Sequence, residues 1–557
     1  MNTENPVLEN ATPVPRKPIF NLTNGDTAFT VSAVVVCIFA SLFGFFSGFA
    51  FGYMLSALLM FAVFAVYFAK SFKLKLLPII FGLLSLANTV VFITTSNGWV
   101  RFFAFVLSFL LGFACFDSLI HGSPKGNFRT FGIFTSAFMT IGNIGISMRS
   151  IFTSRKSQKR VFPKILLGLA CALPIILIVV PLLIASDDAF SGMMDKIGSA
   201  GAAPIFKSIF GISISIFVIS YGFSLKNGSL KRVRPIKLSG IENIYVISFL
   251  SSISVCYLLY LFSQLAYFFS AFSGFLPGGK ITYAEYARKG FFEMCAIAVI
   301  NLILIFATLI FAKKTGGKMC GIIKAIATFI SLFTLMIIAT AISKMVLYIN
   351  TYGMTVKRLT TSAFMVFLAI VFLSVILRIF VKKINIMNTA LAAAGCIVVL
   401  LGTFNVNSVC AKYNYESYVN KRLNTIDINA IYELGDEGVP YIVKLSCVND
   451  EVVALEAQDY LSSLYTHDYF ENIFASQDYT VETLKPNAIK KGFEKYSIPN
   501  AKAYSALYEF IEKNPTFPEV YRERIEAAQS YDDDYYSEPD YYDEEYEFPP
   551  DYYTMYD

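Results

Sequence analysis

The sequence predicts an all-α fold: a polytopic helical membrane protein with about 11 transmembrane helices and a small, mostly helical, soluble C-terminal domain. Composition is the first reason, because 55% of the 557 residues are hydrophobic and 15% are charged, whereas roughly a quarter of a soluble domain is charged. The mean hydropathy of +0.57 agrees. The second reason is that apolar residues come in blocks of about 20, the length that crosses the hydrocarbon core of a bilayer.

Eleven apolar runs of that length are separated by polar or charged turns. They occupy residues 28–47, 50–69, 76–95, 100–120, 164–185, 204–223, 244–270, 291–312, 321–343, 361–380 and 389–408. The first two runs form one uncharged stretch, too long for a single span, in which Gly48 and Gly52 offer a turn. Residues 128–150 are apolar but shorter, so we expect an interfacial helix on the cytoplasmic face near 128–150. The transmembrane domain then covers 28–409, after a cytoplasmic tail at 1–27.

Charge is divided unevenly along the chain. Residues 1–409 hold 34 Lys and Arg against 10 Asp and Glu, a net charge of +24, and residues 410–557 hold 12 against 30, a net charge of −18. With a cytoplasmic N-terminus, 25 of the 34 basic residues fall in loops on the cytoplasmic side and nine on the other. The positive-inside rule therefore predicts that the N-terminus is inside. An odd number of spans then places the C-terminal domain outside.

From about residue 410 the composition becomes that of a soluble protein, with apolar residues at helical spacing. We expect an extracytoplasmic helical domain over 410–530 that binds a peptide-like partner or caps the membrane part. Residues 531–557 contain 11 acidic residues and nine tyrosines without a Lys or Arg, which is typical of a disordered segment. Loose capture of divalent cations or of a basic partner is the alternative role for this tail.

Several classes of site have no support in the sequence. Two histidines, His121 and His467, argue against a His-rich metal site. The sequence has no Walker A, Rossmann glycine, HExxH or GxSxG pattern, and no basic run interleaved with aromatic residues that would indicate nucleic-acid binding. We therefore expect no cofactor, no metal, no nucleic acid and no identifiable catalytic residue. Cys410 and Cys447 could form a disulfide on the outer side, although free thiols are the more expected state.

The stretch PGGKITYAEYARKGFFE, residues 277–293, carries the candidate ligand-binding site. Glu293 lies about one turn into a predicted span, where a carboxylate is costly unless it is paired or faces a cavity. The candidate site residues are Tyr283, Glu285, Tyr286, Arg288, Lys289 and Glu293, with Gln264 from the preceding span and Arg358 from the next outer loop. The competing interpretation is structural: Thr282 and Glu285 have the form of a capping box, and the charges form an ion-pair network.

The segment YAEYARKGFFE (283–293) resembles a bacterial family of multi-pass membrane proteins described as a domain of unknown function. Similar stretches occur at 173–190, 350–364 and 406–445, and the resemblance covers about 160–450. It implies a polytopic protein of the bacterial cytoplasmic membrane, and it implies no reaction. The residues that match the family are Tyr283, Glu285, Tyr286, Arg288, Gly290, Phe291 and Glu293, with Tyr352, Gly353, Thr355 and Arg358.

The sequence therefore favours a non-enzymatic envelope sensor or scaffold with a polar outer-leaflet site, in which Glu293 and Arg358 could meet. Its partners would be the lipid bilayer and an envelope protein or lipid headgroup. The alternative is a transporter or flippase of a small polar or lipid-linked substrate, which a wide cavity lined by Gln264, Glu293 and Arg358 would favour. A membrane enzyme is less favoured, and Glu285 and Glu293 are its candidate carboxylates.

Overall fold

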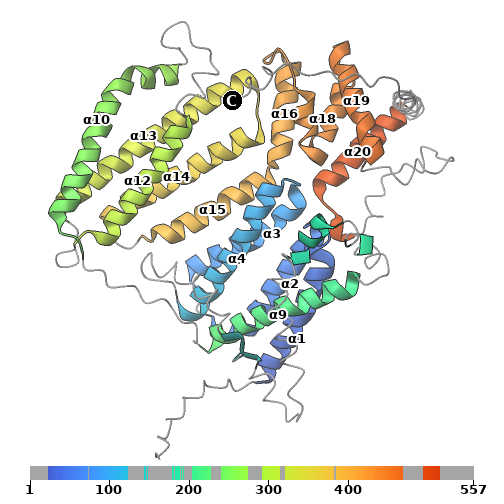
Figure 1. Cartoon of the computed structure of the whole chain (residues 1–557), viewed down its shortest axis with the longest axis horizontal. Coiled ribbons are helices and arrows are strands. Elements are labelled where there is room, and N and C mark those ends of the chain that lie inside the picture. Colours follow the sequence, from blue (N-terminus) through green and yellow to red (C-terminus); the bar gives the residue numbers. More distant parts are fainter. Residues whose placement is uncertain are drawn as a thin grey trace, which may run out of the picture.

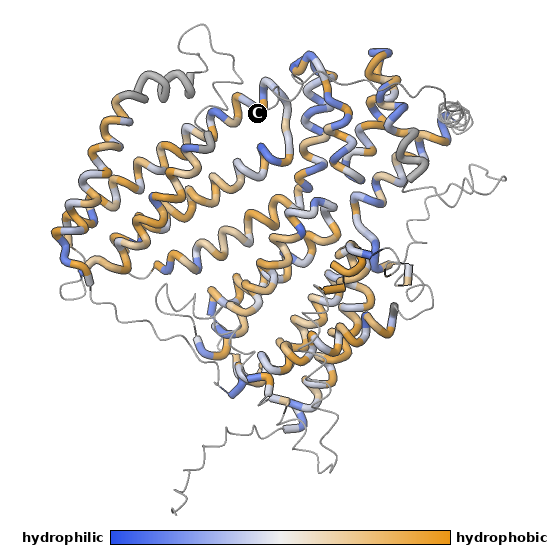
Figure 2. Tube along the Cα trace, in the orientation of Figure 1, coloured by the Kyte–Doolittle hydropathy of each residue, from blue (hydrophilic) through white to orange (hydrophobic). Residues whose placement is uncertain are grey.

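The computed structural model describes residues 23–72, 75–122, 143–145, 147–148, 179–180, 182–187, 190, 192–193, 203–227, 240–273, 291–313, 320–381, 384–467 and 493–514. Ten helices within these residues are long and apolar enough to cross a membrane. Figure 2 shows that these helices are predominantly hydrophobic, whereas the helices at the end of the chain are more polar. The protein is therefore an integral membrane protein with a polytopic, helical membrane part in contact with lipid.

The first helical bundle comes from the N-terminal part of the chain (Figure 1). It consists of α1 (Asn24–Ala40) with its π-helical extension η1 (Ser41–Phe45), α2 (Phe51–Phe68) with η2 (Ala69–Ser71), α3 (Leu76–Thr94), α4 (Gly98–His121) and α9 (Ala203–Lys226). Gly48 has a φ of +86°, so it makes the predicted turn between the first two spans. The Asn97 side chain accepts a hydrogen bond from the Val100 backbone N–H at 3.0 Å and so caps α4.

Helix α9 runs antiparallel to α1. The Ser41 hydroxyl donates to the Lys207 carbonyl at 2.5 Å near one end, and Lys226 contacts Asp26 at 2.5 Å at the other. We call these the far end and the Asp26 end of the bundle. Because α4 finishes at the Asp26 end beside α2, whereas α9 begins at the far end, Gly122 and Ala203 lie at opposite ends.

A second bundle consists of α10 (Asn243–Ser273), α12 (Phe291–Phe311), α13 (Gly321–Tyr352) and α14 (Val356–Phe380). Its core includes the fully buried Ile330 and Phe372. The buried Asn301 side chain donates to Thr334 at 2.9 Å and accepts from the Tyr257 hydroxyl at 2.5 Å. This polar contact joins α10, α12 and α13, because interhelical hydrogen bonds satisfy groups that lipid cannot.

Helix α15 (Ile386–Thr403) is shared by the two bundles. It packs against α3 and α4 of the first bundle and against α14 of the second (Figure 1). Its Leu391 and Val398 belong to the first hydrophobic core and its Ile386 to the second. The position of α15 thus fixes the two bundles relative to each other.

The last helices form a compact unit at the far end of the first bundle (Figure 1), which we call the cap domain. It consists of α16 (Val406–Val419), α17 (Ile428–Tyr432), η5 (Gly435–Glu437), α18 (Val439–Leu445), α19 (Glu451–His467), η6 (Phe493–Lys495) and α20 (Ile498–Lys513). Ile431, Ile442, Leu445, Leu461 and Leu507 are completely buried in its separate core. The apolar residues that recur at helical spacing after residue 410 of the sequence form this core.

Ten of the eleven predicted spans correspond to these helices, whereas the run 164–185 lies mostly outside the described residues. The tails 1–22 and 515–557, which include the acidic segment 531–557, also lie outside them. Of the predicted interfacial segment 128–150, residues 143–145 and 147–148 are described, among them Asn143 and Ser147. These two residues hydrogen-bond to Ser224 and Ser220 of α9 at 3.1 and 3.4 Å. The rest of that prediction stays open.

Candidate functional site

The structure describes a minority of the predicted site residues. Five of them, Tyr283, Glu285, Tyr286, Arg288 and Lys289, lie outside the described residues. Gln264 is part of α10, but its side chain is not among those described. Glu293 is in the first turn of α12 and is exposed. Arg358 is in the first turn of α14 rather than in a loop, because Thr355 caps that helix by accepting from the Arg358 backbone N–H at 3.3 Å.

Glu293 and Arg358 do not form an ion pair with each other among the described contacts. The Arg358 guanidinium donates to the carbonyls of Tyr352 and Gly353 at 3.1 and 2.5 Å and stacks over the Tyr348 ring at 4.0 Å. Carbonyls at a helix C-terminus lack helical partners, and a cation there interacts favourably with the negative end of the helix dipole. The C-terminus of α13 therefore holds the Arg358 side chain. Glu293 instead interacts electrostatically with Lys344 of α13.

The main polar contact between the cap domain and the first bundle is centred on Glu437. This residue is 2% exposed, and its carboxylate accepts from the Ser96 backbone N–H at 2.7 Å, from the Ser96 hydroxyl and from the Thr95 hydroxyl at 3.3 Å. We call these contacts, with those of Asn405 and Asn407, the Glu437 interface. A buried carboxylate is tolerated when hydrogen bonds compensate its lost hydration, and the loop between α3 and α4 supplies them.

Two asparagines extend the Glu437 interface. Asn405 donates to the Thr94 carbonyl at 2.8 Å. Asn407 accepts from the Asn97 amide at 2.8 Å and donates to the Leu434 carbonyl at 3.0 Å. Asn405 is also the N-cap of α16 and has a φ of +54°, so it turns the chain sharply between α15 and the cap domain. The direction of the cap domain is thus set by hydrogen bonds rather than by a continuous helix.

Arg101 supplies positive charge beneath the Glu437 interface. Its guanidinium donates to the carbonyls of Thr95 at 2.6 Å, Phe92 at 3.1 Å and Gly48 at 3.2 Å. It also interacts electrostatically with Glu437 and with Asp436. One arginine therefore joins the ends of three membrane helices and balances the buried carboxylate above them.

A second contact joins the cap domain to the second bundle. The Asn414 amide of α16 donates to the Met354 carbonyl at 2.9 Å, and its oxygen accepts from the Met354 backbone N–H at 2.7 Å. Gly353 has a φ of +79°, and a Cβ there would lie 2.7 Å from the Asn414 oxygen. We call this the Asn414 clamp. It requires glycine at 353 for both its backbone conformation and its close approach.

A third contact reaches the turn before α2. The Phe51 backbone N–H donates to the Tyr496 carbonyl at 3.2 Å, and the Phe43 and Phe493 rings lie 5.5 Å apart. The cap domain therefore rests on three separate interhelical connections at the far end, those before α2, between α3 and α4, and between α13 and α14. Any displacement of the domain has to change contacts in both bundles.

The cap domain also contains an open groove of about 970 Å³ between α16, α18 and α20. Lys444 lies over the rings of Tyr415 and Tyr441 at 5.7 and 5.0 Å, and neither Lys444 nor Lys421 has an ion-pair partner in the described part of the chain. The other charges of the groove are satisfied internally: Tyr418 donates to Asp450 at 2.8 Å and Lys513 to Glu509 at 2.7 Å. The groove therefore presents two cations and several aromatic rings to a partner.

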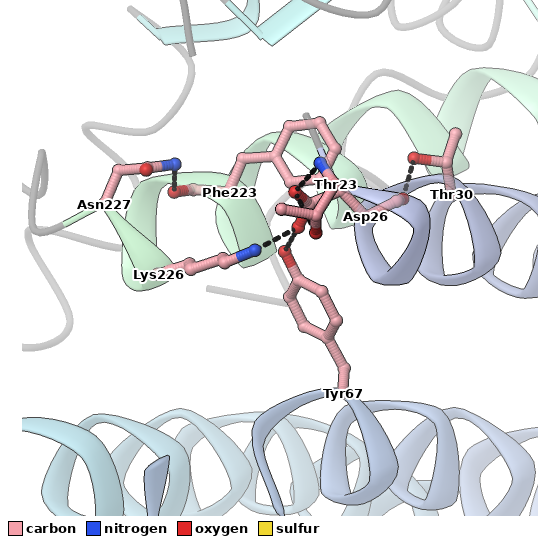
Figure 3. A network of polar contacts seen from close by, with 7 residues as sticks. All are labelled: Thr23, Asp26, Thr30, Tyr67, Phe223, Lys226 and Asn227. Carbon is pink, nitrogen blue, oxygen red and sulfur yellow. Dashed lines mark hydrogen bonds and ion pairs between the residues drawn. The ribbon is translucent and has the colours of Figure 1, made fainter. Parts of the chain in front are cut away.

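A network at the opposite end of the first bundle is built on Asp26 (Figure 3). One carboxylate oxygen accepts from the Tyr67 hydroxyl and from Lys226, each at 2.5 Å. The other accepts from the Thr23 backbone N–H at 2.7 Å and the Thr23 hydroxyl at 2.9 Å. The side chain of Asp26 is 3% exposed, so this network fixes α1, α2 and α9 together where they reach the membrane boundary.

The sequence contains a local signal for the Asp26 network, and it contains none for the contacts of Glu437 or Lys344. Thr23 and Asp26 have the spacing of a capping box, which the structure forms. Glu437 is one of many acidic residues in a polar region, and Lys344 is a single lysine beside an apolar run. Nothing local distinguishes either residue, because their partners are distant in sequence.

Residues 79–445 match the family model described as Domain of unknown function (DUF4153). This is more than half of the chain. The chain belongs to the DUF4153 family. The matched region begins in α3 and ends with α18, so it includes α15, the Glu437 interface and the Asn414 clamp. Searches of curated proteins and of solved structures gave no match. Membership of the DUF4153 family confirms the resemblance inferred from the sequence, and it assigns no reaction.

Proposed function

We propose that the protein is a non-enzymatic sensor or scaffold of the bacterial cytoplasmic membrane, whose cap domain binds an anionic segment of an envelope protein. The observation that carries the proposal is the attachment of the cap domain to both bundles, through Glu437 on one side and Asn414 on the other. Such an attachment lets a partner bound to one small domain influence the relative position of all the helices below it.

The orientation in this proposal has the N-terminus inside and the cap domain outside. Two observations support it. The start of α1 and the cap domain lie at opposite ends of the first bundle (Figure 1), and with a cytoplasmic N-terminus 25 of the 34 basic residues in 1–409 fall in loops on the cytoplasmic side, as the positive-inside rule requires. Ten described spans alone would return the chain to the same side, so the proposal includes an odd number of crossings between Gly122 and Ala203.

The groove supports recognition of an anionic macromolecule. Its cations Lys421 and Lys444 have no ion-pair partner within the described residues. The aromatic ring beneath Lys444 holds its ammonium group in the groove, where it can pair with a carboxylate of a partner. The groove includes Val419, which lies 13 residues along α16 from Val406, a rise of about 20 Å. This distance favours a protein segment beyond the lipid headgroups over a headgroup itself.

The predicted outer-leaflet site remains part of the proposal in a reduced form. An ionisable side chain in a membrane helix is costly and is therefore a functional candidate, and Glu293 of α12, whose charge acts on Lys344 of α13, is such a side chain. Alanine at Glu293 or at Arg288 with unchanged expression, stability and host phenotype would remove this site. Transport would need a cavity that includes Glu293 and Arg358, whereas the two cavities found among the described residues are lined by other side chains.

Site-specific photocrosslinking in the native host tests the proposal. Benzoylphenylalanine replaces Val443, which lines the groove, and in a matched control it replaces Val452, which is 74% exposed on α19 and outside the groove. We expect one discrete adduct from position 443 and none from 452, and we expect Lys444→Glu to reduce the adduct at least fivefold. Equal adducts from both positions, or an adduct unaffected by Lys444→Glu, would refute recognition at the groove.

A further inference from the structure

A cavity of about 410 Å³ lies within the first bundle, between α1, α2, α3, α4 and α9. This volume is in the range of small-ligand sites, roughly 300 to 1,000 Å³. Along α2 it extends from Tyr53 to Phe64, which is about 16 Å of helix and about half the thickness of a hydrocarbon core. The cavity is therefore elongated in the direction in which lipid chains run.

The wall of the cavity offers few free hydrogen-bonding groups to an occupant. Aromatic rings and aliphatic side chains form most of it, and its serine and threonine hydroxyls are already used. Ser56 donates to the Gly52 carbonyl at 2.6 Å, Ser85 to the Ser108 carbonyl at 2.7 Å and Thr89 to the Leu86 carbonyl at 2.7 Å. A buried water needs two to four polar partners, so a wall with its hydroxyls satisfied favours an apolar occupant.

Tyr221 is the exception in this wall. The residue is 6% exposed, and its hydroxyl has no hydrogen-bond partner in the described part of the chain. It lies on α9 five residues before Lys226, so it is about 8 Å from the end of that helix. An unpaired buried hydroxyl is destabilising, because nothing compensates its lost hydration. A ligand with an acceptor at this depth would remove this destabilisation.

The cavity also reaches a face of the bundle that lipid would cover. Phe109 of α4 lines it and is 43% exposed, whereas α9 packs mainly along α1. The ring of Tyr221 meets Phe113 of α4 at 4.8 Å. An acyl chain could therefore enter beside Phe109 without separation of the tightly packed pairs α1–α9 and α3–α4.

We propose that this cavity binds one acyl chain of a glycerophospholipid from the leaflet at the Asp26 end, with the ester carbonyl of the lipid accepting a hydrogen bond from the Tyr221 hydroxyl. The depth of Tyr221 suits the ester group, and the elongated apolar space beyond it suits the chain. This site is separate from the cap domain and independent of the function proposed above. It makes the first bundle a lipid-binding unit.

The test uses the full chain in nanodiscs with phosphatidylglycerol that carries a diazirine in its acyl chain. After irradiation, adducts are located by mass spectrometry. We expect adducts on Met60 and Phe113, which line the cavity, at several times the yield found on Leu332, which is 55% exposed on α13. Cavity adducts no more frequent than those on Leu332 would overturn the proposal.

Cavity-filling variants provide the control. Ala57→Trp should reduce cavity adducts at least fivefold. Leu59 is also on α2 but does not line the cavity and is 40% exposed, so Leu59→Trp should leave the adducts unchanged. If Ala57→Trp does not elute as a folded protein, Met60→Trp replaces it. Unchanged adducts in both filled variants would refute the site. Tyr221→Phe should release phospholipid more readily during detergent exchange. Retention equal to wild type would refute the ester contact.

A diazirine fatty acid distinguishes the source of the chain. We expect it to label the cavity at least fivefold less than the phospholipid at equal concentration. Equal labelling by the fatty acid, together with no effect of Tyr221→Phe, would show that free fatty acid rather than phospholipid occupies the site and would overturn the proposal as stated.

Discussion

Glu437 of the cap domain accepts a hydrogen bond from the backbone N–H of Ser96, 341 positions earlier in the chain, at 2.7 Å. The carboxylate is buried between the cap domain and the hairpin of α3 and α4, and Arg101 lies close enough to interact with it. This single side chain therefore links the folding of the cap domain to the geometry of α3 and α4.

Replacement of Glu437 by alanine should lower the stability of the full chain by about 1–3 kcal/mol, because it leaves the buried donors of Ser96 and Thr95 without an acceptor. Glu437→Gln retains one acceptor and should cost less. Thermal unfolding in nanodiscs measures both. Glu433→Ala, an exposed acidic residue on the same segment, is the control. A loss no greater than that of the control would show that the interface is not stabilising.

Lys226→Met should destabilise the Asp26 network. It leaves the carboxylate of Asp26, 3% exposed, without its cation. Removal of one partner of a fully buried pair costs about 3–5 kcal/mol. Since the Lys226 side chain is 39% exposed, we expect about 2 kcal/mol.

Thermal unfolding of the Asp26→Asn/Lys226→Met double variant tests the cause of that loss, because it should recover most of the stability. Lys207→Met, at the other end of α9 where the lysine lies over the Phe46 ring, is the control and should cost less. A double variant as unstable as Lys226→Met would mean that the loss does not arise from the unpaired carboxylate.

Thiol labelling of intact cells tests the side on which the cap domain lies. Cys410 and Cys447 are both free thiols, so the disulfide considered from the sequence is not formed. Burial raises the pKa of the Cys410 thiol to about 12, whereas Cys447 is exposed. A membrane-impermeant maleimide should therefore label wild type and not Cys447→Ser. Labelling that appears after permeabilisation and not before would place the cap domain inside the cell.

The contact between Tyr418 and Asp450 should be sensitive to acid. The hydrogen bond from the Tyr418 hydroxyl holds the pKa of Asp450 below its ordinary value of 3.8. A lowered folded-state pKa stabilises the protein fully above the ordinary value, and this stabilisation disappears as the pH falls through the folded-state pKa. The difference in melting temperature between wild type and Tyr418→Phe should be constant from pH 7 to pH 5 and shrink below about pH 4. A difference that grows on acidification would contradict this assignment.

The membrane helices were predictable because their signals are local. The run 291–312 predicts α12 at Phe291–Phe311 almost to the residue, since length and hydropathy alone decide that a segment spans. The end of α13 was less predictable. Lys344 suggested a loop, but the helix continues to Tyr352 and carries that lysine to a position where Glu293 interacts with it.

The polar contacts were not predictable in the same way. The partners of Asp26 and of Glu437 are up to 200 and 342 positions away in sequence, so their burial depends on packing that no local pattern describes. The expected meeting of Glu293 and Arg358 stays a prediction, and the described contacts of Arg358 are local. The carbonyls at the end of α13 lie nearer to Arg358 in the chain and satisfy its guanidinium.

The shared position of α15 has a consequence for biogenesis. Both bundles are built from segments that precede Ile386, and a chain emerges from the ribosome N-terminus first. The surfaces of α3, α4 and α14 that α15 covers therefore stay open to lipid until the last helix has inserted. The cap domain is synthesised immediately afterwards. The two halves are thus joined only after every other described membrane helix has emerged, by a helix and a domain that leave the ribosome one after the other.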